Sequence, residues 1–182
     1  LVGEAYDEPV LLIKTAWGGK SIHKDFRPPS SSGSTGEFYK KMLAEYREGL
    51  AKLGDEFPQL AKRKPELSGF VWFQGWNDMF DDKALKEYKA NLINLVKDVR
   101  REFRQPNLPV VIGELGNGGP KAGKNMVTIR EAQKAAAKAL GPNTTFVQTT
   151  QFARPAKESP NVGHGHHWYG NAESYFLIGD AL

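Results

Sequence analysis

One stretch of the chain, Gly69-Phe70-Val71-Trp72-Phe73-Gln74-Gly75-Trp76-Asn77-Asp78, joins the pattern of a buried strand to a polar turn. Its first half is aromatic and β-branched, which is typical of a strand buried on both faces of a parallel sheet. The second half places Gln74, Asn77 and Asp78 at the carboxyl end of that strand, where open α/β sheets bind their ligands. The stretch therefore predicts a binding loop. An Asn-Asp turn that caps the next helix is the alternative.

Strand and helix patterns alternate along the rest of the chain. Buried strands are predicted at residues 10–16, 70–73, 110–114 and 144–149, and helices at 36–53, 85–103, 125–140 and 172–182. Alternation of this kind predicts a mostly parallel sheet with helices on both faces. The Ser- and Gly-rich segment 30–36 reads as a flexible surface loop rather than a linker between domains.

Length and composition limit the class of protein. A chain of 182 residues fits a single domain, which we expect to span residues 1–182. The net charge of +4 is interleaved with acidic residues, and no basic block resembles a nucleic-acid-binding arm. No apolar run approaches the roughly 20 residues that insert across a bilayer. Without cysteine there is no disulfide and no thiolate chemistry, and the redox compartment stays open.

Four polar or glycine-rich turns follow the predicted strands. They begin at Gly18-Gly19, Gln74, Glu114 and His164. Parallel strands place their carboxyl ends along one edge of a sheet, so we expect the four turns to converge there. Four tryptophans also fall at predicted strand ends, where their faces could stack on sugar rings: Trp17, Trp72, Trp76 and Trp168.

The histidine cluster His164, His166 and His167 has three interpretations. A histidine held by a glycine-rich loop can act as a general base near neutral pH. A zinc site is the second interpretation, although it would need further ligands from Glu114 or Asp78. A solvated His-rich loop without chemistry is the third.

The Gly18-Gly19 pair and Glu114 are open to two interpretations each. Two glycines at a strand end can offer backbone N–H groups to an anion or to a developing oxyanion, or can simply form a tight turn. Glu114 could orient a histidine or bind a sugar hydroxyl. It could equally pair with a lysine or arginine of a helix.

Four blocks taken in order resemble the sialate O-acetylesterase-like branch of the SGNH hydrolases. They are Ile13-Lys14-Thr15-Ala16-Trp17-Gly18-Gly19-Lys20-Ser21, Trp72-Phe73-Gln74-Gly75-Trp76-Asn77-Asp78, Val111-Ile112-Gly113-Glu114 and His167-Trp168-Tyr169-Gly170-Asn171-Ala172. The resemblance implies a flavodoxin-like three-layer α/β/α domain that removes acetyl groups from carbohydrates by a serine mechanism, without a metal or other cofactor. It implies no preference for any one oligomeric state.

The same resemblance assigns roles to individual residues. Gly18 or Gly19 would supply an oxyanion N–H, Gln74 and Asn77 would be side-chain donors, and His167 would be the base. Contacts with the acetylated carbohydrate are expected from the remaining candidates. These are Trp76, Trp17, Asp78, Glu114 and His164.

Two departures from the family pattern shape the expected function. The family's nucleophile lies in a Gly-Gln-Ser-Asn type block at the end of its first strand, and nothing here matches it, so the chain resembles the family without its first βα unit. The family often carries an Asp three residues before the catalytic His, and here that position is His164. We therefore expect an esterase of which this chain carries the oxyanion and base elements. A non-catalytic carbohydrate-binding domain and a zinc hydrolase are the alternatives, and whether the full-length protein is secreted or periplasmic stays open.

Overall fold

The chain folds around a three-stranded parallel sheet. The computed structural model describes residues 2–182. Its strands are β1 (Phe70–Trp72), β2 (Val110–Gly113) and β3 (Thr144–Val147), paired in the order β1-β2-β3. Val110 of β2 lies opposite Phe70 on one side and Thr144 on the other. Three of the four predicted strands are therefore confirmed.

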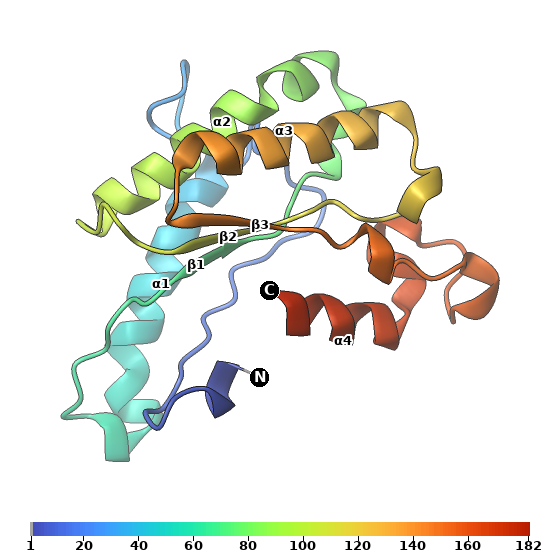
Figure 1. The fold of residues 1–182 in the computed structure, drawn as a ribbon. Helices are drawn as coiled ribbons and strands as arrows, with labels where there is room; N and C mark the ends of the chain where they lie inside the picture. Colours follow the sequence, from blue (N-terminus) through green and yellow to red (C-terminus); the bar gives the residue numbers. More distant parts are fainter. Residues whose placement is uncertain (1) are drawn as a thin grey trace.

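Four long helices surround the sheet. They are α1 (Glu37–Glu56), α2 (Asp82–Glu102), α3 (Lys124–Leu140) and α4 (Ala172–Ala181). Figure 1 shows α2 and α3 side by side over one face of the sheet and α4 on the opposite side. Helices on both sides of a parallel sheet confirm the expected α/β class and its three-layer arrangement. No helix within residues 2–182 is both long and apolar enough to span a membrane.

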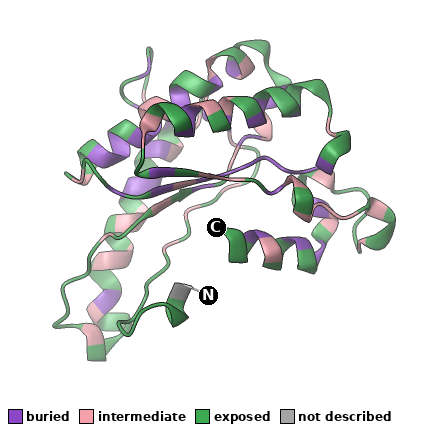
Figure 2. Ribbon diagram, in the orientation of Figure 1, coloured by how far each residue is buried: buried purple, intermediate pink, exposed green. Residues whose placement is uncertain are grey.

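The core lies between the sheet and the helices α2 and α3. Alternate residues of each strand point to opposite faces, so Trp72 and Ile112 are buried on the α2–α3 side whereas Val71 is 53% exposed on the other. Trp72 is a core residue that packs edge-on against Phe26, at 5.3 Å between ring centroids. The expectation of an exposed Trp72 is wrong. In Figure 2 the buried residues line the inner sides of α2 and α3.

The prediction of a strand at Val10–Ala16 is wrong. This segment is extended but has no ladder partner, and none of its backbone groups forms a hydrogen bond to another described residue (Figure 1, blue). Ile13 packs against Gly49 of α1, while Leu12 on the opposite side is 79% exposed. The residues have the composition of a strand, but a strand also needs a neighbour to accept and donate its backbone hydrogen bonds.

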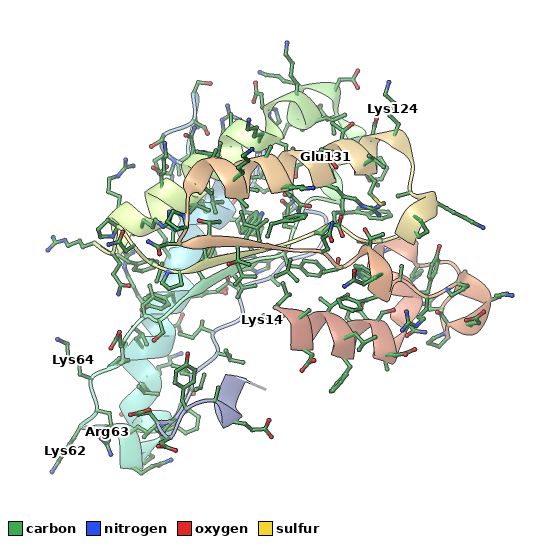
Figure 3. All side chains as sticks on the ribbon, viewed as in Figure 1. Lys14, Lys62, Arg63, Lys64, Lys124 and Glu131 are labelled. Carbon is green, nitrogen blue, oxygen red and sulfur yellow. The ribbon has the colours of Figure 1, made fainter. Side chains whose placement is uncertain are left out.

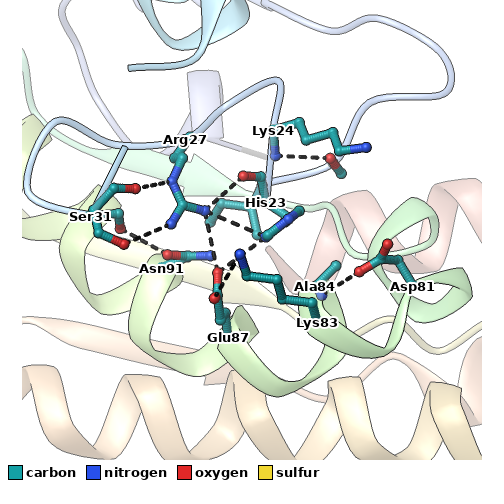
Figure 4. A network of polar contacts seen from close by, with 12 residues as sticks. His23, Lys24, Arg27, Ser31, Asp81, Lys83, Ala84, Glu87 and Asn91 are labelled. Carbon is teal, nitrogen blue, oxygen red and sulfur yellow. Dashed lines mark hydrogen bonds and ion pairs between the residues drawn. The ribbon is translucent and has the colours of Figure 1, made fainter. Parts of the chain in front are cut away.

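The Ser-rich segment 30–36 is anchored rather than flexible. Both the amide and the hydroxyl of Ser30 donate to the carboxylate of Asp98, which is 1% exposed on α2. Ser31 is buried and donates to Asn91 of the same helix. Just before it, Arg27 bridges to Glu87, as Figure 4 shows. The segment 23–31 is thereby held along α2.

Candidate functional site

The Gly18-Gly19 turn is held by side chains from the polar turn after β1. Asn77 donates to the carbonyl oxygen of Gly19 (2.8 Å), and Gln74 donates to that of Lys20 (3.0 Å). The amide N–H groups of Gly18 and Gly19 have no partner among the described residues, and both glycines are exposed. Gly19 adopts φ +67°, which glycine reaches without steric cost. The glycine turn thus presents two free N–H groups beside the polar turn that follows β1.

Asp78 fixes the chain just after the glycine turn and the side chain of Gln74. Its carboxylate is fully buried and accepts the amides of Ile22 and His23, each at 3.0 Å, and a side-chain N–H of Gln74 at 2.7 Å. Burial raises the pKa of Asp78, and the bonds from Gln74 and the two amides oppose that rise. Its oxygens are turned inward, so the structure gives Asp78 a positioning role rather than the expected contact with substrate.

Gln74 is a hub of this network. Its side-chain NH2 has two protons, and the bonds to Lys20 and Asp78 use both. The backbone carbonyl oxygen of Gln74 accepts hydrogen bonds from the hydroxyl of Tyr88 (2.6 Å) and from the side-chain NH2 group of Gln133 (2.9 Å). Gln74 therefore has no proton left for an oxyanion in this structure. Asn77 keeps one, because only its bond to Gly19 is formed.

The histidines lie on the loop Gly165–Gly170 and the residue before it. Ring centroids are 4.2 Å apart for His166 and His167, and 5.3 Å for His164 and His166. Partial desolvation of the ring and the two neighbouring histidines lower the pKa of the exposed His166. Asn117, which is buried after β2, donates to the carbonyl oxygens of Gly165 (3.1 Å) and His166 (3.3 Å), and so ties this loop to the sheet edge.

The backbone of the histidine loop is unusual just after His167. Trp168 and Tyr169 both adopt left-handed conformations, at φ 50° and 55°, which cost non-glycine residues energy. Trp168 is buried and stacks near Phe73, and the hydroxyl of Tyr175 donates to the carbonyl oxygen of His167 at 2.8 Å. These contacts fix the backbone of His167 while its side chain remains exposed.

An aromatic contact joins the β1 turn to the histidine loop. Trp76, which follows the β1 turn, lies 5.7 Å from His166 between ring centroids. The predicted convergence therefore joins the Gly18-Gly19 turn, the β1 turn and the histidine loop. Trp17 does not share in it: the ring packs against Phe38 and Phe26 and lies under the ammonium group of Lys41.

Glu114 is also committed to internal bonds. One carboxylate oxygen accepts the amides of Thr149 and Thr150 at 2.8 Å each, and the hydroxyl of Thr150 at 2.7 Å. The side chain is 6% exposed, so it fastens the end of β3 to that of β2. No carboxylate among the described residues bonds to His167, and Glu114, one of whose interpretations was to orient a histidine, bonds to Thr149 and Thr150 instead.

Known proteins resemble the chain in sequence and in fold. The model of the family described as carbohydrate esterase, sialic acid-specific acetylesterase, matches residues 2–170. The chain belongs to this family. It is 31% identical over 68 residues to a probable carbohydrate esterase of Arabidopsis thaliana, an alignment that spans 37% of this chain and 25% of the plant protein. The crystal structure of that Arabidopsis protein superposes with a TM-score of 0.53 at 19% identity, and covers 91% of this chain and 59% of its own. The chain therefore spans little more than half the length of this solved relative.

The three clustered histidines do not form a metal site with other described residues. Although their rings are close, no group of three or more His, Asp or Glu side chains within residues 2–182 is arranged to hold a metal ion. Glu114 and Asp78, the additional zinc ligands considered from the sequence, are occupied by amide donors. The zinc interpretation gains no support from the geometry.

The sequence did not reveal several residues that position the candidate site. Arg130 donates to the carbonyl oxygens of Leu115, Asn117 and Gly119, which shapes the turn after β2. Gln133 accepts from the amide of Leu115 and donates to Gln74. A signal was present in α3, because both polar residues fall on its buried apolar stripe. Polar side chains in such a stripe need internal partners.

Two surface hollows lie away from the histidines. They have volumes of about 400 and 370 Å³ and share Glu66, Leu67 and Gln105, which precede β1 and β2. They are therefore at the amino ends of the strands, opposite the candidate site. The candidate site is therefore placed at the carboxyl edge of the sheet, where the free N–H groups of the glycine turn and the exposed imidazoles lie.

Proposed function

We propose that this chain carries the oxyanion and base elements of a carbohydrate acetylesterase, within a single SGNH-hydrolase-like domain that uses a metal-independent Ser/His mechanism. One observation supports this most directly. The amides of Gly18 and Gly19 are free, exposed and fixed by Asn77, and the β1 turn that fixes them reaches the histidine loop through Trp76. Preorganised N–H donors beside an imidazole are the requirement of acyl transfer.

The reaction follows from these groups. A serine hydroxyl attacks the acetyl carbonyl carbon while His167 takes its proton, and the carbonyl oxygen becomes an oxyanion held by the N–H groups of Gly18 and Gly19 and the spare proton of Asn77. His167 then protonates the sugar oxygen as the ester C–O bond breaks. Water attacks the acetyl-serine in the same way and releases acetate. Loss of one such oxyanion donor costs about 10²–10³ in kcat.

We propose that the serine comes from outside residues 2–182. Ser21, beside the glycine pair, is buried, and its hydroxyl donates to Asp25 and accepts from the amide of Lys24. One edge of β1 has no strand partner among the described residues, and Val10–Ala16 is extended and unpaired. A strand added along β1 would end at the same edge as Gln74, where its last side chain could reach the oxyanion donors.

The test compares this chain with the full-length protein on an acetylated polysaccharide, with acetate release as the readout. We expect turnover by the full-length protein only, resistant to a chelator, and lowered about 10²–10⁴-fold by His167→Ala. Phe176→Ala, an exposed aromatic change on α4, is the matched control and should leave turnover unchanged.

Three results would contradict the proposal. Strong activity of the 182-residue chain that disappears in Ser21→Ala would reveal a local nucleophile. Loss of activity with a chelator and its return with zinc would favour the zinc hydrolase. Binding of carbohydrate without turnover by the full-length protein would favour the binding domain.

A further inference from the structure

Three aromatic side chains form a continuous row that leads away from His167. Ring centroids are 4.2 Å apart for His167 and His166, 5.7 Å for His166 and Trp76, and 6.0 Å for Trp76 and Phe80. We call Phe80, Trp76 and His166 the aromatic row. Phe80, at its far end, is 69% exposed and was not among the candidate residues of the sequence.

The backbone that carries Phe80 is fixed on both sides. The 3-10 turn Asn77–Phe80 contains the buried Asp78, and the carbonyl oxygen of Met79 accepts the side chain of Asn125 on α3 at 2.9 Å. Directly after it, Asp81 caps α2 by accepting the amide of Ala84. The exposure of Phe80 is therefore imposed by a rigid frame, and a flexible loop does not account for it. A preorganised aromatic surface loses little entropy on binding.

We propose that the aromatic row is a stacking subsite for the sugar rings next to the acetylated one, so that the substrate is an acetylated oligosaccharide or polysaccharide rather than a monosaccharide. This rests on the proposed function, which places the acetyl group near His167. The row begins next to that residue, at His166, and continues through Trp76 to Phe80, so it offers more rings than the one sugar unit that carries the ester needs.

The chemistry of the row suits a sugar chain. A pyranose ring has a C–H face that packs on the negative face of an aromatic ring, and its hydroxyls project sideways. Such hydroxyls would meet a polar group beside the row, the exposed imidazole of His164, whose ring centroid is 5.3 Å from that of His166. Partial desolvation of the ring and its histidine neighbours lower the pKa of His166, which favours the neutral ring that stacks on a sugar face.

The experiment measures carbohydrate binding, which needs no nucleophile, by calorimetry on the 182-residue chain. The probes are hexasaccharides of xylose, glucose, mannose and N-acetylglucosamine, and the corresponding methyl monosaccharides. We expect at least one hexasaccharide to bind more tightly than its monosaccharide. Phe80→Ala should weaken that binding about five- to tenfold, and Phe80→Tyr, which keeps the ring, should retain it.

A matched control separates this effect from general loss of surface. Phe176 on α4 is 64% exposed and has no ring partner among the described residues, so Phe176→Ala should leave the hexasaccharide affinity unchanged. Equal weakening by the two alanine changes, no preference for hexasaccharides, or no binding by any of them would each overturn the subsite.

Failure of the subsite and failure of the esterase proposal give different results. If full-length protein releases acetate but hexasaccharide affinity is the same in wild type and Phe80→Ala, the subsite is wrong and the esterase stands. If affinity depends on Phe80 while the full-length protein releases no acetate, the subsite stands and the esterase is wrong.

Discussion

Removal of the Asp78 carboxylate should destabilise the protein strongly, because three donors converge on it. Asp78→Ala leaves the amides of Ile22 and His23 and one N–H of Gln74 without their acceptor. A hydrogen bond to a charged group contributes about 1.5–3 kcal/mol. The sum is reduced because the variant no longer buries a carboxylate, whose desolvation is large enough to raise the pKa of Asp78. We expect the free energy of unfolding to fall by about 3 kcal/mol.

Urea unfolding followed by tryptophan fluorescence measures this change. With a slope of about 2 kcal/mol per molar, the midpoint should fall by about 1.5 M. Hydrogen exchange should also quicken at the amides of Ile22 and His23. Asp82→Ala is the matched control, because Asp82 is exposed at the start of α2 and should cost less than about 1 kcal/mol. Equal shifts in the two variants, or unchanged exchange at both amides, would refute the reasoning.

Three further changes test other parts of the structure. The pKa of Asp78 is raised in the folded protein, so the protonated carboxyl stabilises the fold below the ordinary value of 3.8, and this stabilisation is lost as the pH rises through the raised pKa. The difference in unfolding free energy between wild type and Asp78→Ala, measured by urea unfolding from about pH 4 to about pH 7, should therefore narrow as the pH rises, and a widening difference would contradict this. Gly75→Ala should cost about 1–3 kcal/mol in the same assay, because the added Cβ would lie 2.8 Å from Ile129, whereas Gly179→Ala, with open space around it, should cost nothing. Val71→Lys should reduce self-association of the 182-residue chain in light scattering, since Val71 is 53% exposed on the open-edged strand β1; unchanged scattering would argue against association through that strand.

Local patterns were sufficient to predict most elements of the fold. The apolar run at Phe70–Trp72 and the buried stripe of α3 depend on neighbours in sequence, and both elements formed where expected. Val10–Ala16 has equally good strand residues, yet pairing depends on a partner that no local pattern supplies. The same limit applies to the segment 30–36, because Ser30 is bound by Asp98, a helix residue 68 positions further along the chain.

The sequence predicted where the residues of the candidate site lie better than it predicted what their side chains bond to. The backbone of the glycine pair and the amide and histidine side chains did gather at the carboxyl edge, because parallel strands bring their ends together. Sequence could not tell which polar groups face inward: Asp78 and Glu114 look like ligand-binding residues after a strand, but their partners are amides 55 and 35 residues away. Phe80 was overlooked for the opposite reason, since an apolar residue after a polar turn suggests packing rather than exposure.

The anchoring of the Ser-rich segment has a consequence for how this protein would be cut by proteases. Proteases need several residues in a free, extended backbone, and the Asp98 bonds deny this to Ser30 although its composition is that of a linker. The exposed basic run Lys62-Arg63-Lys64, which Figure 3 shows projecting from the turn between α1 and β1, bonds to no distant helix or strand among the described residues; the amide of Arg63 donates to the nearby carbonyl oxygen of Leu60. Trypsin would therefore be expected to separate α1 from the sheet at this run before it cleaves at Arg27, whose side chain is held to Glu87.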